Sequence, residues 1–263
     1  MRIDFLGTGG YHPNDRRQTA CLMMPEIGLV FDAGTAAYRI GRRMQTDRLK
    51  IVLTHAHWDH IIGLTYLLVP VFNGQIKQLE VWGTAATLKA IQTHLFANET
   101  FPVMPEIEFH QLDEVDGFDV EQGRLTWFPL VSHPGGSMAY RLDWGGSEGQ
   151  SIRSFAYVTD TTVDGTYTAF LNGVDVLVHE CFFPDGNEAL AEQTGHSTVT
   201  TVARLARDLS VKQLILTHVD PQKTGDDPVG LDAARAIFPN TELAEDLSSL
   251  DLVKGGPLCL PEA

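Results

Sequence analysis

Short apolar runs recur along the chain, and each of them turns polar at its C-terminal end. The runs are rich in β-branched residues and have the length of a buried strand, so the pattern predicts β-strands. The residue that ends each run can bind a metal or carry a negative charge. The five runs are KIVLTH, FPLVSH, FAYVTD, DVLVHE and QLILTH, which end at His55, His133, Asp160, Glu180 and His218.

Segments with the spacing of amphipathic helices lie between these runs. They span residues 84–96, 164–171, 199–209 and 231–237. Buried strands that alternate with helices predict a layered α/β fold, and we expect residues 1–263 to form a single domain. Ligands of such sheets gather at the carboxyl ends of the strands. We therefore expect the five strands to present their chemistry at one edge.

Composition narrows the class of protein. The chain has 263 residues, of which 43% are apolar and 20% charged, as in an ordinary globular protein. Its three cysteines form no CxxC pair, so neither a disulfide framework nor a thiolate zinc site is expected. Pro70, Asn73 and Gly74 break the longest uncharged apolar stretch, and the N-terminus lacks a signal-peptide core. We expect a cytoplasmic protein without a membrane span.

The net charge is −15, from 34 acidic and 19 basic residues. Such a surface repels polyphosphate chains at long range, so tight non-specific binding to nucleic acid is not expected. Local basic spots remain, among them Arg16-Arg17, and Arg17 is a candidate contact for a substrate phosphate.

The segment THAHWDH, residues 54–60, concentrates metal-binding side chains. His55 and His57 lie two positions apart, so at an extended strand end they point the same way and can chelate one ion. Asp59 and His60 precede the run 61–69, where a helix is expected to start, and they can face a second ion. Imidazoles and carboxylates suit zinc, with manganese or iron as alternatives. The competing interpretation is a solvated histidine-rich loop.

This segment resembles the signature of the metallo-β-lactamase fold superfamily, and later residues follow in the family's order. Asp32 in LVFDAG resembles the buried aspartate that precedes the signature. The resemblance implies a four-layer αββα sandwich with two divalent ions at one edge of its sheets. It assigns His55, His57 and His133 to the first ion, Asp59, His60 and His218 to the second, and Asp160 to both.

The assignment agrees with the chemistry of dinuclear sites. Two ions about 3.5 to 4 Å apart can share a bridging hydroxide and stabilise both oxygens of a displacement. Taken alone, His133 is equally compatible with a capped turn in SHPGG, and Asp160 with a helix cap in TDTT. The heptad decides in favour of metal binding.

Two further motifs resemble the tRNase Z (ribonuclease Z) branch of phosphodiesterases. One is GTGGYHPNDRRQTACL near the N-terminus, and the other is the strand that ends in Glu180 followed by His196-Ser197-Thr198. In that branch the glutamate and the histidine work together, and the histidine protonates the leaving oxygen. A carboxylate beside a histidine favours the charged imidazole, which suits a general acid. The candidate catalytic residues are therefore Asp59, Glu180 and His196. The alternative for His196 is a surface histidine beside the cap of the following helix.

The chain differs from tRNA-maturing members of the branch in two regions that are expected to bind the tRNA. Only 26 residues separate His133 from Asp160, where most members carry a long arm, and GGSEGQSIRS is a short, barely charged turn. VDPQKTGDDP after His218 lacks the branch's Ser-Arg-Tyr-like run. The substrate is therefore either an RNA 3′ end or a small phosphodiester such as a cyclic nucleotide. A lactone or thioester hydrolase and an inactive metal-binding protein are further alternatives, and the resemblance implies a possible homodimer.

Overall fold

The computed structural model describes residues 1–121, 123–145 and 153–260, and the chain divides into two compact units. Unit 1 comprises Met1–Asp116 and Glu245–Ala263, and unit 2 comprises Gly117–Ala244. Most of the predicted turn at residues 145–154 lies outside the described residues. No helix of the described part is long and apolar enough to cross a membrane.

Unit 1 contains a mixed seven-stranded sheet in the order β14-β1-β2-β3-β4-β5-β6. The strands from β14 to β3 pair antiparallel and those from β3 to β6 pair parallel. The strands are β1 (Arg2–Gly7), β2 (Cys21–Met24), β3 (Leu29–Phe31), β4 (Arg48–Val52), β5 (Gln78–Gly83), β6 (Glu108–Gln111) and β14 (Ser248–Asp251).

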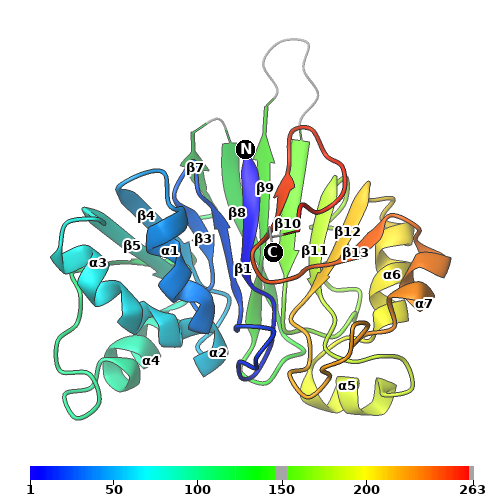
Figure 1. Ribbon diagram of the computed structural model, residues 1–263, viewed down its shortest axis with the longest axis horizontal. Coiled ribbons are helices and arrows are strands. Elements are labelled where there is room, and N and C mark those ends of the chain that lie inside the picture. The colour runs from blue at the N-terminus through cyan, green and yellow to red at the C-terminus, as the bar shows by residue number, and fades with distance from the viewer. Residues whose placement is uncertain (122, 146–152, 261–263) are drawn as a thin grey trace. The chain divides into compact units, whose positions relative to one another are not determined.

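Short helical segments accompany this sheet and share an apolar core with it. The α-helices are α1 (Ile40–Arg43), α2 (Trp58–Ile61), α3 (Leu68–Phe72) and α4 (Ala85–Ala90). The other helical segments are η1 (Thr35–Arg39), η2 (Ile62–Leu67), the π-helix η3 (Ile91–Leu95) and η4 (Leu112–Glu114). Helix α4 begins where the Thr84 side chain accepts from the Thr87 amide, and it packs on β5 and β6 (Figure 1).

Unit 2 contains the second mixed seven-stranded sheet, in the order β13-β12-β11-β10-β9-β8-β7. Its strands are β7 (Phe118–Val120), β8 (Gly123–Leu130), β9 (Ser137–Trp144), β10 (Arg153–Val158), β11 (Val176–Glu180), β12 (Gln213–Thr217) and β13 (Thr241–Leu243). Its helices are α5 (Glu188–Thr194), α6 (Val199–Asp208) and α7 (Leu231–Ile237).

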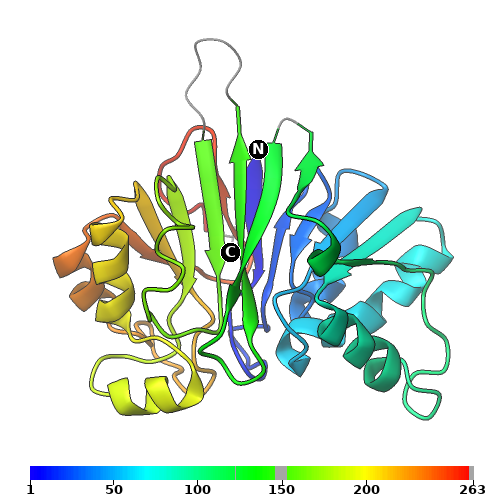
Figure 2. The same cartoon turned by 180° about the vertical axis from the view of Figure 1, so that it is seen from behind.

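Helices α6 and α7 lie side by side next to β12 and β13, as the yellow and orange ribbons of Figures 1 and 2 show. Val199, Val202, Ala203 and Ala206 recur at helical spacing on α6 and are buried in one cluster with alternate residues of β10 and β12. The apolar pattern of the sequence therefore accounts for how α6 packs on its sheet.

Most of the predicted elements are confirmed. Helices form within residues 84–96 and 199–209 and over Leu231–Ile237. Of the five predicted strands, β8, β10, β11 and β12 run in one direction in the second sheet, so their C-terminal ends share one edge. The fifth, β4, belongs to the sheet of unit 1.

Two helix predictions were wrong in detail. Residues 164–171 form a series of turns, because Gly165 takes a φ of +83° and the amides of Thr168 and Leu171 bond to carbonyls three or four residues back without propagating a helix. The helix after the heptad begins at Trp58, with His57 as its N-cap, so Asp59 and His60 lie inside its first turn.

Candidate metal centre

In unit 1, Asp32 fixes the start of the histidine-rich segment. Its carboxylate accepts hydrogen bonds from the Thr54 amide at 2.8 Å, from the Thr54 hydroxyl at 3.0 Å and from His60 Nδ1 at 2.8 Å. Asp32 and His60 are both fully buried. The hydroxyl hydrogen of Thr54 goes to Asp32, so His55 Nδ1 is the donor in its 3.0 Å contact with the Thr54 oxygen. Both histidines therefore turn Nε2 away from Asp32.

These constraints bring four metal-binding side chains close together. The His55 ring lies 4.4 Å from that of His57 and 4.3 Å from that of His60, centroid to centroid. His60 Nε2 lies 3.3 Å from Asp59 Oδ2, which also accepts from the Tyr11 amide at 2.7 Å. All of them except His57 are buried. Unit 1 thus carries a compact cluster of three imidazoles and one carboxylate.

Unit 2 carries a second cluster at the edge where its strands end. Asp160 Oδ1 lies 3.2 Å from His218 Nε2, and Asp160 Oδ2 lies 3.6 Å from His133 Nε2. The His133 ring is oriented by its Nδ1, which donates to the Gly195 carbonyl at 3.1 Å. Asp160 therefore offers a separate oxygen to each imidazole.

Backbone strain accompanies the two clusters. Asp32, Asp160 and His218 have φ values of +59°, +51° and +57°, which non-glycine residues adopt at a cost of about 1 to 3 kcal/mol each. Asp32 and His218 directly follow a strand, and Asp160 lies two residues beyond the end of one. Such strain concentrates at functional sites, and here it aims side chains that belong to the clusters or orient them.

The donor chemistry fits a bound cation. His60 and His133 each donate Nδ1–H to an oxygen acceptor, so in the neutral ring Nε2 is an acceptor that faces a carboxylate. Two acceptors at this distance repel each other unless a proton or a metal ion lies between them. A histidine whose second nitrogen donates to a carboxylate or a carbonyl is the usual arrangement of a metal ligand. The buried His/Asp clusters are therefore consistent with a dinuclear metal site.

Glu180 and His196 form a pair beside the cluster of unit 2. His196 Nδ1 lies 3.0 Å from Glu180 Oε1, and Glu180 is fully buried. The carboxylate also accepts from the amides of Thr161 at 2.7 Å and Ser197 at 3.2 Å, so its orientation is fixed. The His196 ring stacks on Phe182 at 4.6 Å between centroids, and 11% of its side chain remains exposed.

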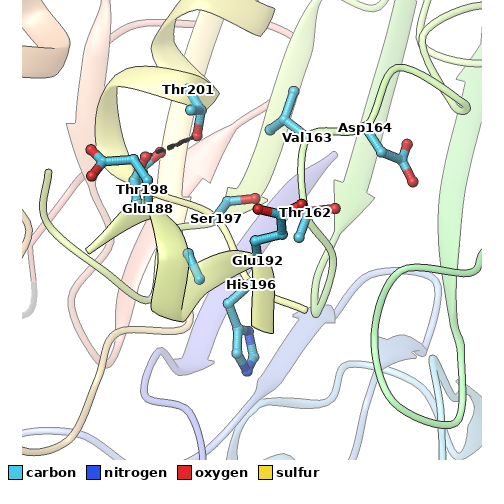
Figure 3. Close-up of a pocket in the computed structure, with 10 residues that line it drawn as sticks. Thr162, Val163, Asp164, Glu188, Glu192, His196, Ser197, Thr198 and Thr201 are labelled. Atoms are coloured by element: carbon cyan, nitrogen blue, oxygen red, sulfur yellow. Dashed lines mark hydrogen bonds between the residues drawn. The ribbon is translucent and has the colours of Figure 1, made fainter. Parts of the chain in front are cut away.

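A cavity of about 250 Å³ lies next to this pair (Figure 3). His196 stands at one end of the group, with its ring pointing away from Thr201. The lining contains hydroxyl groups and the carboxylates of Asp164, Glu188 and Glu192, so an anionic group is disfavoured there.

His179 belongs to a second buried pair, which the sequence did not predict. Its Nε2 lies 2.9 Å from the Tyr167 hydroxyl, and its Nδ1 lies 2.8 Å from the Glu180 carbonyl oxygen. Burial lowers the pKa of His179 and raises that of Tyr167 well above its ordinary value, so both are neutral near neutral pH. Its partner Tyr167 lies in the segment 164–171, which was expected to be a helix and forms turns instead.

Arg17 is buried and makes polar contacts with Glu245 and Thr8. Its guanidinium is 2% exposed, forms an ion pair with Glu245 at 2.8 Å and donates to the Thr8 hydroxyl. Its role as a substrate contact stays a prediction.

The chain is similar to known proteins over nearly its whole length. A family model described as a β-lactamase superfamily domain matches residues 29–219. A ribonuclease Z of Gloeothece citriformis is 30% identical over 306 aligned positions, which cover 96% of each chain. That alignment is longer than the 263 residues of this chain, so more than forty of its positions have no counterpart here.

Solved structures match the fold. A metallo-β-lactamase fold protein of Bacillus subtilis gives a TM-score of 0.73 at 19% identity, covering 94% of this chain and 98% of that one. The short form of human tRNase Z gives 0.72 at 23% identity, covering 96% and 99%. Two mixed sheets with flanking helices are common to these proteins and this chain, so the predicted αββα fold class is confirmed.

Proposed function

We propose that this chain is a dinuclear-metal-dependent phosphodiesterase. The proposal proceeds from its family: the chain belongs to the metallo-β-lactamase superfamily and is a hydrolase related to ribonuclease Z. Its metal ligands would be the seven residues that the family pattern assigns. They are His55, His57, Asp59, His60, His133, Asp160 and His218. Zinc is the first candidate for both ions, with manganese or iron as alternatives.

The Glu180–His196 pair is the observation that carries this proposal. Bound divalent ions would polarise the phosphate and activate the attacking water. When the P–O bond to the leaving group breaks, the alkoxide needs a proton, and His196 can donate it from Nε2 while Nδ1–H stays bonded to Glu180. A lactone keeps its leaving group tethered and needs less help from an acid, so the pair favours phosphodiester cleavage over the lactonase and thioesterase alternatives.

The substrate is either an RNA 3′ end or a small phosphodiester, and three features favour the small one. The net charge of −15 opposes a polyanion, and only 26 residues lie between His133 and Asp160. More than forty positions of the aligned ribonuclease Z also lack a counterpart in this chain. A hydrolysis panel on metal-loaded protein tests this. It contains bis-p-nitrophenyl phosphate, cyclic nucleotides, a tRNA precursor, a lactone and a thioester.

Substitution of the proton donor tests the mechanism. We expect His196→Ala to keep both metals but to lose about 10²- to 10⁴-fold in kcat on an unactivated phosphodiester. The loss on a p-nitrophenyl ester should be much smaller, because that leaving group is stable without a proton. His94→Ala, an exposed histidine in η3, is the matched control and should change neither rate. Equal losses on both substrates would assign His196 to phosphate binding instead.

A further inference from the structure

We propose that Tyr167 and His179 are positioning residues for the Glu180–His196 pair and that they act through the backbone of Glu180. This inference rests on the proposed function, because it gives the two residues a role only if His196 transfers a proton.

The direction of both hydrogen bonds follows from the chemistry of the partners. A carbonyl oxygen only accepts, so His179 Nδ1 carries the hydrogen that is shared with the Glu180 carbonyl at 2.8 Å. The buried ring is neutral, so Nε2 holds a lone pair and accepts from the Tyr167 hydroxyl at 2.9 Å. Tyr167 therefore holds the His179 ring, and the ring holds the Glu180 peptide.

His179 and Glu180 are the last two residues of β11, so their side chains point to opposite faces of the sheet. On one face, Tyr167 belongs to the apolar cluster that also contains Leu177. On the other, the Glu180 carboxylate accepts from His196. The Glu180 peptide is thus the link between the apolar core and the proton donor.

The hydrogen bond between Tyr167 and His179 adds little stability by itself. Two buried polar groups gain little over an apolar pair of similar volume, because each hydrogen bond mainly offsets the loss of water. The contacts do fix the Glu180 peptide at the point where the strand ends. A displacement of about 1 Å in a catalytic group can cost about 10²-fold in rate, so a rotation of this peptide would misalign His196.

The test compares variants on an unactivated phosphodiester and on a p-nitrophenyl ester, with the metal-loaded full-length protein. We expect His179→Leu to lose about 10- to 100-fold in kcat on the unactivated diester, as substitutions of orienting partners do, with little change in KM or on the activated ester. Tyr167→Phe should show the same difference between substrates more mildly. His179→Asn, whose amide can still donate to the Glu180 carbonyl, should recover part of the loss.

Leu171→Ala is the control, since Leu171 is buried in the same cluster as Tyr167 but makes no side-chain hydrogen bond. It should lower Tm without separating the two substrates. If Tyr167→Phe and His179→Leu behave like Leu171→Ala while His196→Ala separates the substrates, the positioning role is overturned and the proposed function stands. If His196→Ala does not separate them, both are overturned. Tyr167→Phe removes only one hydroxyl, so it decides the matter even where His179→Leu fails to fold.

Discussion

At the scale of single residues, Asp160 is the cluster residue with the most constraints on its side chain and backbone. Each of its carboxylate oxygens faces a different imidazole, and its own backbone is strained. If Asp160 is a ligand of both ions, its removal should weaken metal binding at both sites.

We therefore expect the purified protein to carry close to two equivalents of zinc or manganese, and Asp160→Ala to lower the occupancy of both sites. Elemental analysis after gel filtration measures this. Asp208→Ala, which removes an exposed carboxylate at the end of α6, should keep both equivalents. A full first site in Asp160→Ala would exclude the bridging role.

The sequence predicted residue types better than it predicted their geometry. The spacing of THAHWDH predicts that its histidines and aspartate lie near one another, because this needs only local chain geometry, and the structure places them in one compact cluster. The left-handed backbone at Asp160 and His218 could not be predicted from the residue types. Aspartate and histidine occur in left-handed conformations more often than most residues, both at functional sites and elsewhere. Tyr167 and His179 were missed because they meet only through tertiary structure.

At the scale of elements, the end of α5 supports the cluster of unit 2. Gly195 ends this helix with a φ of +73°, and its carbonyl orients His133. A Cβ at this position would lie 2.5 Å from the Cα of His133 and 2.6 Å from the Ser132 carbonyl oxygen. The helix end and the His133 loop are therefore packed backbone against backbone, which requires glycine.

Gly195→Ala should consequently impair both folding and metal binding. The left-handed backbone costs an alanine about 1 to 2 kcal/mol, and the steric clash adds about 1 to 3 kcal/mol. Gly173→Ala is the matched control, because Gly173 has the same φ of +73° with no atom within 4 Å of an added Cβ. Urea unfolding should show a larger loss of stability for Gly195→Ala than for Gly173→Ala. Zinc titration should show weaker zinc binding for Gly195→Ala and unchanged binding for Gly173→Ala. Equal effects of the two substitutions would mean that the contact with His133 is unimportant.

Element prediction succeeded where apolar periodicity and burial agree. Helix α7 was predicted with its observed bounds, and α6 to within one residue. It failed at residues 164–171, where Asp164 bonds to the Thr166 amide and hydroxyl and Gly165 takes a left-handed conformation. Those local hydrogen bonds compete with a helix, and an apolar pattern does not report them.

At the scale of the whole molecule, the net charge of −15 bears most directly on the substrate. Most proteins that bind RNA contact its phosphates with basic groups. Their affinity falls as the salt concentration rises, because the release of counterions from the RNA then gains less entropy. A strongly acidic protein should show the opposite behaviour, since salt screens its repulsion of a polyanion.

We expect KM for an RNA oligonucleotide to fall a few-fold between about 10 mM and 100 mM NaCl, where the Debye length shrinks from about 30 Å to about 10 Å. KM for a small diester with one negative charge should change much less, because a single charge feels a weaker repulsion. Steady-state kinetics with both substrates at constant metal concentration measures the two slopes. A KM for RNA that rises steeply with salt would instead reveal a local basic surface strong enough to override the net charge, and it would favour an RNA 3′ end as the substrate.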